Sequence, residues 1–343
     1  MTRALITGCS GCIGSNLTAA LNRRGIDVIG LVQPQAPTRT LQGLHLTRVT
    51  GDILDRDSLL PLMRSVDWVF HLAAVADDWK HTPETIQRVN VQGSVNVFSA
   101  ALEAGVKRLV YTSSAAALGS MRPGVTLLDE TSPFNLPPDL WPYAHSKITA
   151  EQILQDYIRR GLDAVSVLPS AVLGPGDQSL ISGQLVLRAL QGEWFPFPSG
   201  GANFIDARDA AAGHLAAAEH GRTGERYLLA GHNLSHLSVL GALSDVLQLP
   251  MHYLPLPNAV LPGMARAVGL LRRGGVRLPI DEARIRLSGQ YLYYDNRKAV
   301  RELGLAPRPF AESVQAAFQW YLAHGYLDRC RLPGAAVLAG GAL

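Results

Sequence analysis

Three regularly spaced glycines near the start of the chain are the feature that most restricts its fold. Ala4-Leu5-Ile6 is a short apolar run, and Gly8, Gly11 and Gly14 follow it in a G-x-x-G-x-x-G pattern. Residues 12–24 have a helical pattern, and Gly14 is expected to open this first helix. A second apolar run covers 27–32. This order predicts a βαβ unit whose turn amides and helix N-terminus bind the pyrophosphate of a dinucleotide. The turn residues expected at the cofactor are Gly8, Ser10, Gly11, Cys12, Ile13 and Gly14.

The same alternation of strands and helices continues for most of the chain. Apolar runs at 46–49, 68–72, 108–112 and 164–168 alternate with helical patterns at 57–64, 85–104 and 143–160. Strands that are apolar throughout predict a parallel sheet covered on both faces, a Rossmann-type doubly wound α/β fold. We assign 1–173 to the dinucleotide-binding domain, with a return segment at about 204–230, and we assign 174–203 and 231–330 to a smaller substrate-binding lobe. Residues 331–343 are expected to form a loose tail.

Composition excludes several classes of partner. Apolar residues make up 47% of the chain and the formal net charge is +3, with no basic block that would follow a phosphate backbone, so nucleic acid is not expected as a partner. No apolar run reaches 18 residues and none near the start has the form of a secretory signal, so we expect no membrane span and a cytoplasmic protein. Residues 259–271, followed by Arg272-Arg273, have features of an interfacial membrane helix. The Pro and Gly interruptions of this segment favour a wall of the substrate lobe instead.

The chain has three cysteines, and two of them form a C-x-x-C pair. Cys9 and Cys12 lie within the glycine turn, whereas Cys330 is far away in sequence. No second Cys or His pair at metal-ligand spacing accompanies them, so we expect no metal site and no redox pair. The two turn cysteines are interpreted as small filling residues.

A tyrosine and a lysine four residues apart are the candidate catalytic pair. Tyr143 and Lys147 share one face of the predicted helix 143–160, where the ammonium group would lower the pKa of the phenol. Hydroxyl donors stand at the end of the strand 108–112, in Thr112-Ser113-Ser114, at the edge of the sheet where ligands bind. Such a set can move a proton while a hydride passes between a nicotinamide and a carbonyl carbon. Asp78 and Trp79, which follow the strand 68–72, are expected either to line the substrate pocket or to form a surface loop.

These motifs together resemble those of the extended short-chain dehydrogenase/reductase family. Thr7-Gly8 opens the T-G-x-x-G-x-x-G of that family, Gly51-Asp52-Ile53 is similar to its adenine-contacting segment, and His71–Ala74 is similar to its turn under the cofactor. Asn90 with Gly93 resembles its N-x-x-G, and Tyr143 with Lys147 matches its Y-x-x-x-K. The resemblance implies Ser114, Tyr143 and Lys147 as catalytic residues, with Ser113 as the alternative serine, and a homodimer formed through 85–104 and 143–160. It also implies cofactor contacts from Asp52, Ile53, Leu72, Ala73, Ala74, Asn90, Thr112, Ser113, Tyr143, Lys147, Pro169 and Val172.

The residues after the second strand bear on the choice between NAD and NADP. An acidic residue there would bind the ribose 2′-hydroxyl of NAD, but the chain reads Leu31-Val32-Gln33-Pro34. Arg39 follows in the loop and can neutralise a 2′-phosphate, although a loop arginine can also be simply solvated. We therefore expect Gln33 and Arg39 near the adenosine ribose and favour NADP over NAD.

The segment after the strand 164–168 bears on the substrate. Pro169-Ser170-Ala171-Val172-Leu173-Gly174-Pro175 is similar to the P-T-x-V-x-G-P of dihydroflavonol reductases and 3β-hydroxysteroid dehydrogenases, as are Tyr291–Asp295 and Glu302–Leu305. Ala171 and Ala202 stand where sugar-nucleotide epimerases usually have Asn and Arg. This favours redox chemistry on a largely apolar small molecule, with Ser170, Asp78 and Trp79 at the substrate. Two alternatives remain: a nucleoside-diphosphate-sugar 4-epimerase, because the similar proteins include a hopanoid-associated epimerase group, and a dinucleotide-sensing regulator without turnover.

Overall fold

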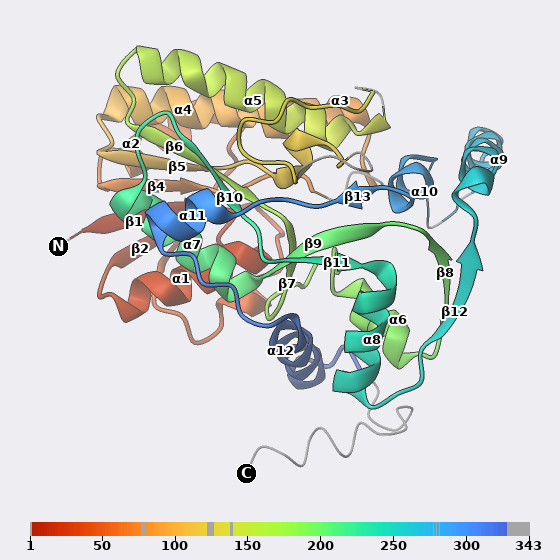
Figure 1. The fold of residues 1–343 in the computed structure, drawn as a ribbon. Coiled ribbons are helices and arrows are strands. Elements are labelled where there is room, and N and C mark those ends of the chain that lie inside the picture. Colours follow the sequence, from red (N-terminus) through yellow and green to blue (C-terminus); the bar gives the residue numbers. More distant parts are fainter. Residues whose placement is uncertain are drawn as a thin grey trace, which may run out of the picture.

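A parallel sheet forms the centre of the molecule (Figure 1). The structure is a computed structural model and describes residues 2–76, 80–121, 127–137, 140–276, 278, 280 and 282–327. Within these residues the sheet has seven strands in the order β3-β2-β1-β4-β5-β6-β10, and each neighbouring pair is parallel. The strands are β1 (Arg3–Thr7), β2 (Asp27–Val32), β3 (Thr47–Thr50), β4 (Trp68–His71), β5 (Arg108–Thr112), β6 (Ala164–Pro169) and β10 (Arg226–Leu229). The predicted doubly wound fold is confirmed, and its order reverses between β1 and β4.

Helices cover both faces of this sheet, as the fully apolar strands require. One face is covered by α1 (Cys12–Arg23), α7 (Ala207–His220) and α11 (Arg297–Leu303), and the other by α2 (Arg56–Met63), α4 (Gly93–Ala104) and α5 (Pro142–Arg159). Each layer encloses its own apolar core. The carboxyl ends of β1, β4 and β5 therefore meet at one edge of a rigid scaffold, where ligands bind in such sheets.

The helix expected over 85–104 contains a local irregularity. It consists of α3 (Pro83–Gln87), a π-helical turn (Arg88–Gln92) and α4, and it ends at Gly105 in the left-handed conformation, φ 67°. Turns of this kind occur often at functional sites. This turn contains Asn90.

A second group of elements forms the smaller part of the molecule. Its centre is β9 (Gly201–Asp206), which pairs with β7 (Ala171–Leu173), β11 (His232–Ser235) and β13 (Tyr291–Leu292). Packed with these strands are α6 (Gln184–Leu190), α8 (His236–Leu247) and α12 (Phe310–Ala323), and at the far end stand the ribbon of β8 (Trp194–Pro198) and β12 (His252–Leu256) and the helices α9 (Leu261–Arg273) and α10 (Glu282–Ser288). None of the described helices combines the length and apolar character needed to cross a bilayer.

The chain returns twice from this part to the main sheet. The first return supplies α7 and β10, within the expected segment 204–230. The second supplies α11, whose Ala299 and Leu303 join the core formed by α1 and α7. The expected lobe segment 231–330 thus includes one helix that packs on the main sheet.

Candidate active site

The glycine turn is tight enough that two of its glycines have no room for a side chain. Gly8 has φ 74°, and a Cβ there would lie 2.8 Å from the nitrogen of Ala73. A Cβ on Gly14 would lie 2.2 Å from the carbonyl oxygen of Gly8. Helix α1 begins at Cys12 with Gly11 as its N-cap, so Gly14 lies in the first turn and does not open the helix as expected.

This turn fits the pyrophosphate of a dinucleotide. The first turn of α1 has no acidic residue, and Gly8, Gly11, Cys12, Ile13 and Gly14 line the wall of a large cavity. Amides at a helix N-terminus, together with the helix dipole, bind anions. The residues present therefore match the cofactor that the sequence predicts.

A buried hydrogen-bonded chain lies beneath the turn. Thr7 Oγ1 is 2.7 Å from His71 Nδ1 and accepts from the amide of Ala73, and His71 Nε2 is 2.9 Å from Ser94 Oγ. Burial lowers the pKa of His71 to about 3, so the imidazole is neutral at physiological pH. The chain joins the glycine turn to the loop that follows β4.

Asn90 shapes the same loop. Its Oδ1 accepts from the amide of Val75 at 2.7 Å, and its Nδ2 donates to the carbonyl of Val75 and to Ser146 Oγ. The π-helical turn thus connects the loop after β4 to the helix that presents Tyr143 and Lys147. Asn90 does not line the cavity, and its side chain contacts Val75 and Ser146 instead.

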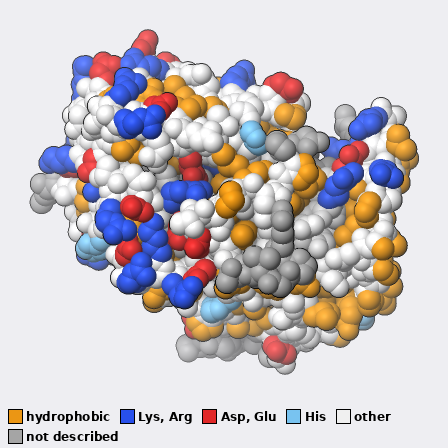
Figure 2. Space-filling model, turned by 45° about the horizontal axis from the view of Figure 1, so that its top comes forward, with side chains coloured by type: hydrophobic (Ala, Val, Ile, Leu, Met, Phe, Trp, Pro, Cys, Tyr) orange, Lys and Arg blue, Asp and Glu red, His pale blue; other side chains and the backbone are white. Residues whose placement is uncertain are grey.

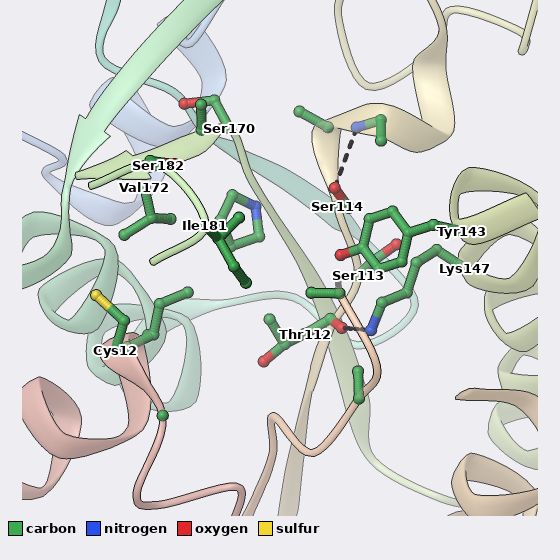
Figure 3. Close-up of a pocket in the computed structure, with 18 of the residues that line it drawn as sticks. Cys12, Thr112, Ser113, Ser114, Tyr143, Lys147, Ser170, Val172, Ile181 and Ser182 are labelled. Atoms are coloured by element: carbon green, nitrogen blue, oxygen red, sulfur yellow. Dashed lines mark hydrogen bonds between the residues drawn. The ribbon is translucent and has the colours of Figure 1, made fainter. Parts of the chain in front are cut away.

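Ser114, Tyr143 and Lys147 line one cavity together with the glycine turn. Figure 3 shows the hydroxyl groups of Ser114 and Tyr143 directed into this space, with the Lys147 side chain below the Tyr143 ring and its nitrogen directed at Thr112. Lys147 Nζ donates to the carbonyl of Thr112 at 2.8 Å and lies 5.9 Å from the centroid of the Tyr143 ring. Ser114 Oγ accepts from the amide of Ala116 at 3.2 Å, which leaves its proton for another acceptor. The arrangement can hold a substrate oxygen and supply it with a proton.

A buried ionic group supports Lys147. Burial lowers the pKa of Lys147 to about 8, and the charge of Glu151 opposes this shift. Glu151 accepts a hydrogen bond from Ser113 Oγ, and its Oε2 lies 2.7 Å from Arg226 Nε. Sequence reasoning missed Glu151 and Arg226. The spacing of four residues between Lys147 and Glu151 was the available signal.

The cavity continues from these residues into the smaller part of the molecule. Its volume is about 470 Å³, and Ile181, Leu287, Leu292 and Tyr294 contribute to its far wall. Ser170 also lines it, and its buried Oγ has no hydrogen-bond partner among the described residues. The only arginine among the described lining residues is Arg284 of α10, which sequence reasoning missed.

The loop 174–183 of the smaller part is hydrogen-bonded to the glycine turn and to the start of α1. Gln178 Nε2 donates to the carbonyl of Ser10 at 2.8 Å, and Asn16 Nδ2 donates to the carbonyl of Pro175 at 2.9 Å. Asp177, which is buried, accepts from the amides of residues 181, 182 and 183 and so fixes the shape of the loop. The two parts of the chain therefore meet directly at the cofactor side of the cavity.

The remaining predicted residues divide by their place relative to the cavity. The structure brings to its lining, besides the catalytic candidates, Gly8, Gly11, Cys12, Ile13, Gly14, Leu72, Ala74, Thr112, Ser113, Pro169, Ser170 and Val172. It places outside the lining Ser10, Gln33, Arg39, Asp52, Ile53, Ala73 and Asn90. Asp78 and Trp79 lie outside the described residues.

The two residues expected near the adenosine ribose have other partners. Gln33 Nε2 donates to Asp52 Oδ2 at 3.3 Å. Arg39 Nη1 donates to the carbonyl of His324 at 3.0 Å, and its guanidinium lies 5.8 Å from the centroid of the Tyr326 ring. Arg39 therefore links the loop after β2 to the end of α12.

The thiols of the turn are poorly suited to redox chemistry. Cys9 and Cys12 are free, and burial raises the pKa of Cys9 to about 11 and that of Cys12 well above its usual value. Reactive cysteines have lowered pKa values. Nor do the described ranges contain a cluster of three or more His, Cys, Asp or Glu residues able to hold a metal ion.

Comparisons with known proteins agree with this geometry. The model of the NAD dependent epimerase/dehydratase family matches residues 4–230. A Synechocystis protein named "Putative dihydroflavonol 4-reductase" is 35% identical, covering 94% of this chain and 95% of its own length. Sterol demethylase protein B of Methylococcus capsulatus is 31% identical, and the match covers 94% of this chain and 99% of that protein. The crystal structure of gox2253 has a TM-score of 0.84 at 32% identity, and the match covers 96% of this chain and 100% of that one. The chain thus belongs to the NAD dependent epimerase/dehydratase family, and it is an NAD(P)-dependent oxidoreductase of the extended short-chain type.

Proposed function

We propose that the protein transfers a hydride between NADP and a carbonyl or alcohol group of a largely apolar small molecule. The observation that carries this proposal is the single cavity that joins the glycine turn, the hydroxyl groups of Ser114 and Tyr143, and an apolar wall including Ile181, Leu287 and Leu292. Apolar pockets with a few convergent polar groups are typical substrate sites. The relatives named for dihydroflavonol and sterol chemistry support the same class of substrate.

The chain's own residues would move one proton. Bound NADPH would supply a hydride from its nicotinamide. As the C–H bond forms at the substrate carbon, the C=O electron pair moves to oxygen, and the Tyr143 hydroxyl gives its proton to that oxygen, so that a ketone leaves as an alcohol. Ser114 donates a hydrogen bond to the same oxygen, and the charge of Lys147 stabilises the phenolate left on Tyr143. Oxidation runs through the same steps in reverse.

The hydrogen bonds favour Ser114 over Ser113 for this task. Ser113 donates its proton to the Glu151 carboxylate, whereas Ser114 accepts from a backbone amide and keeps its proton for the substrate. Ser170, whose buried hydroxyl has no partner among the described residues, supports a further polar contact with the substrate.

The substitution Tyr143→Phe tests the mechanism. We expect NADPH binding to be unchanged and turnover to fall by about 10²–10⁴-fold, the usual contribution of a positioned acid. Tyr157→Phe is the matched control, because Tyr157 lies on the same helix but packs against Phe98, away from the cavity. Steady-state rates and a fluorescence titration with NADPH measure the two quantities. Full activity of Tyr143→Phe would refute the assignment.

The preference for NADP rests on the missing acid after β2 and on Arg39. We expect Arg39→Ala to weaken NADPH binding by about tenfold, the contribution of one charge-assisted hydrogen bond, and to leave NADH binding unchanged. Arg48→Ala is the control, since Arg48 Nη2 donates to the carbonyl of Leu41 in the same region. If Arg39→Ala weakened the binding of NADPH and NADH equally, Arg39 would not contact the 2′-phosphate, and its role would be limited to the hydrogen bond with His324.

One observation favours the epimerase as a second candidate. Arg284 lines the cavity, and an arginine there can pair with the diphosphate of a nucleotide sugar. Following NADPH oxidation with a panel of hydrophobic ketones, alongside conversion of UDP-sugars, separates the candidates. Inactivity on all ketones together with conversion of UDP-sugars would replace our proposal, and inactivity on both, with cofactor binding retained, would favour a dinucleotide sensor.

Two further features belong to the same proposal. We place the protein in the cytoplasm, and we propose a homodimer formed through α4 and α5, the pair expected from the family resemblance. Analytical ultracentrifugation tests the dimer. A monomer at all concentrations would contradict it.

A further inference from the structure

Helix α9 carries apolar side chains that remain exposed in the described structure. It lies against α10, and Leu261, Ala265 and Gly269 form the buried stripe of that contact. Met264, Leu270 and Leu271 are 40%, 68% and 49% exposed. Because Leu271 follows Met264 by seven residues, the two share a face that differs from the buried stripe. The segment lies in the smaller part of the molecule, but α9 adds no residue to the cavity lining and borders the cavity only through α10.

The exposed apolar surface extends from α9 to its neighbours at the same end of the molecule. Thirteen large hydrophobic side chains are exposed in the described residues, and nine of them lie on the ribbon β8–β12, on α9 or within a few residues of α9. These nine, which we call the apolar tip, are Trp194, Tyr253, Leu254, Val260, Met264, Leu270, Leu271, Val276 and Ile280. In Figure 1 this region projects to the right of the molecule, and Figure 2 shows hydrophobic and basic side chains gathered along that edge. Clustered exposed hydrophobic residues mark interaction sites.

The charge of this region determines which partner fits it. Residues 246–280 contain four arginines, Arg266, Arg272, Arg273 and Arg277, and no Lys, Asp or Glu, whereas the whole chain has a formal charge of only +3. Glu282 of α10 lies 3.8 Å from Arg273 and offsets one of these charges. Arg266, Arg272 and Arg273 are exposed on α9 itself. An amphipathic helix with exposed leucines and arginines matches an anionic lipid surface, where the apolar side chains enter the acyl boundary and the arginines meet phosphate groups.

A second copy of the chain fits this surface less well. A two-fold contact through α9 would bring the same arginines of both copies together, and α9 itself has no acidic side chain; Glu282 of α10 lies beside Arg273 of its own copy. In Figure 1, α4 and α5, the proposed dimer helices, lie along the main sheet, whereas α9 stands beyond α10 at the end of the smaller part, so dimerisation through α4 and α5 does not itself cover α9.

The position of the apolar tip relative to the cavity connects docking to the reaction. Ala283, Arg284 and Leu287 of α10 line the cavity on one side of that helix, and α9 packs on α10. We propose that α9 and the ribbon β8–β12 dock on an anionic bilayer surface, so that an apolar substrate reaches the cavity from the lipid past α10. The docking stands on the surface alone, whereas the substrate route rests on the proposed function.

Vesicle sedimentation with the full chain tests the docking. We expect binding to phosphatidylcholine vesicles that contain phosphatidylglycerol, weaker binding to pure phosphatidylcholine, and a loss with added salt. Leu270→Glu should reduce binding to the anionic vesicles by about tenfold, because one leucine no longer enters the lipid. Leu237→Glu is the matched control, since Leu237 is 57% exposed on α8, outside the apolar tip, and its variant should bind like the wild type.

Each possible result decides a separate question. Failure of the wild type to bind anionic vesicles, or equal binding by the Leu270→Glu and Leu237→Glu variants, would overturn the docking. Self-association in ultracentrifugation that Leu270→Glu abolishes, without vesicle binding, would assign the apolar tip to a second copy. Turnover of a water-soluble ketone without vesicles reports on the proposed function independently, and Leu270→Glu should leave it unchanged. Vesicle-dissolved ketones should then be reduced about tenfold more slowly by Leu270→Glu, and an equal rate would overturn the substrate route.

Discussion

Gly14→Ala tests whether the glycine turn has the geometry described above. The added Cβ would lie 2.2 Å from the carbonyl oxygen of Gly8, about 1 Å closer than an ordinary contact. Gly8 has little room to retreat, because it is itself packed against the backbone of Ala73. Forcing one methyl group into such packing costs about 1–3 kcal/mol, which lowers the melting temperature by a few degrees to about 10 °C. The start of α1 must also shift by about 1 Å, so we expect NADPH affinity to fall by about tenfold or more.

Gly11→Ala is the matched variant within the same motif. Gly11 has extended backbone angles, φ −73° and ψ 171°, and its Cβ would meet only the Gly8 carbonyl, at 3.3 Å. We expect its stability to stay within about 0.5 kcal/mol of the wild type, while NADPH affinity falls because the methyl group enters the cavity. Thermal melting without ligand and calorimetric titration with NADPH separate the two effects. Wild-type melting and wild-type affinity for Gly14→Ala would refute the geometry of the turn.

Two further predictions concern buried ionisable groups. Glu151→Gln removes the charge that opposes the burial of Lys147, so the pKa of Lys147 should fall further below about 8 and the alkaline limb of the rate profile should move to lower pH. Activity at pH 8 should then drop by about three- to tenfold, and Glu225→Gln, whose carboxylate pairs with Lys298 near the surface, should leave the profile unchanged. The pKa of His71 is lowered from 6.5 to about 3, so the unfolded chain binds a proton below pH 6.5 that the folded chain does not, and stability is lost as pH falls. At pH 5 this amounts to about 2 kcal/mol, from 1.5 pH units at 1.36 kcal/mol each. His214, whose pKa is lowered to about 4 by burial, adds a loss of its own, so urea unfolding at pH 7 and pH 5 should show a loss that is smaller by about 2 kcal/mol in His71→Asn than in the wild type.

The main sheet was predictable because its signals are local. Each buried strand is a short apolar run, each covering helix has its own period, and the glycine turn lies between a strand and a helix that are adjacent in sequence. The same holds for Tyr143 and Lys147, which one helix places together. The strand 108–112 and its end placed a group of hydroxyl residues at the ligand edge, because parallel strands bring their carboxyl ends to one edge. The choice of Ser114 over Ser113 within that group came from the family resemblance.

Features that depend on distant contacts were not predictable in this way. Arg226 reaches Glu151 only because β10 pairs with β6, and nothing near Arg226 in sequence indicates that neighbour. The π-helical turn around Asn90 is not marked by an apolar period of its own in the sequence. The side chain of Asn90 bonds to Val75 and Ser146, which are distant in sequence. The return of α11 to the main sheet depends on Ala299 and Leu303, which would serve equally well in the core of either part.

The substrate wall and the outer face of α9 show the same limit most clearly. Ile181, Arg284 and Leu292 come from a loop, a short helix and a two-residue strand, so no single period or spacing joins them. The pattern of α9 indicates two apolar stripes, but sequence alone does not tell which stripe meets protein and which meets another phase. The structure shows that the stripe of Leu261 and Ala265 packs against α10, whereas the stripe of Met264 and Leu271 is exposed. Helix α9 is basic, has apolar side chains on two sides, and packs against protein on only one of them. A lipid surface explains this combination better than a second layer of protein core does.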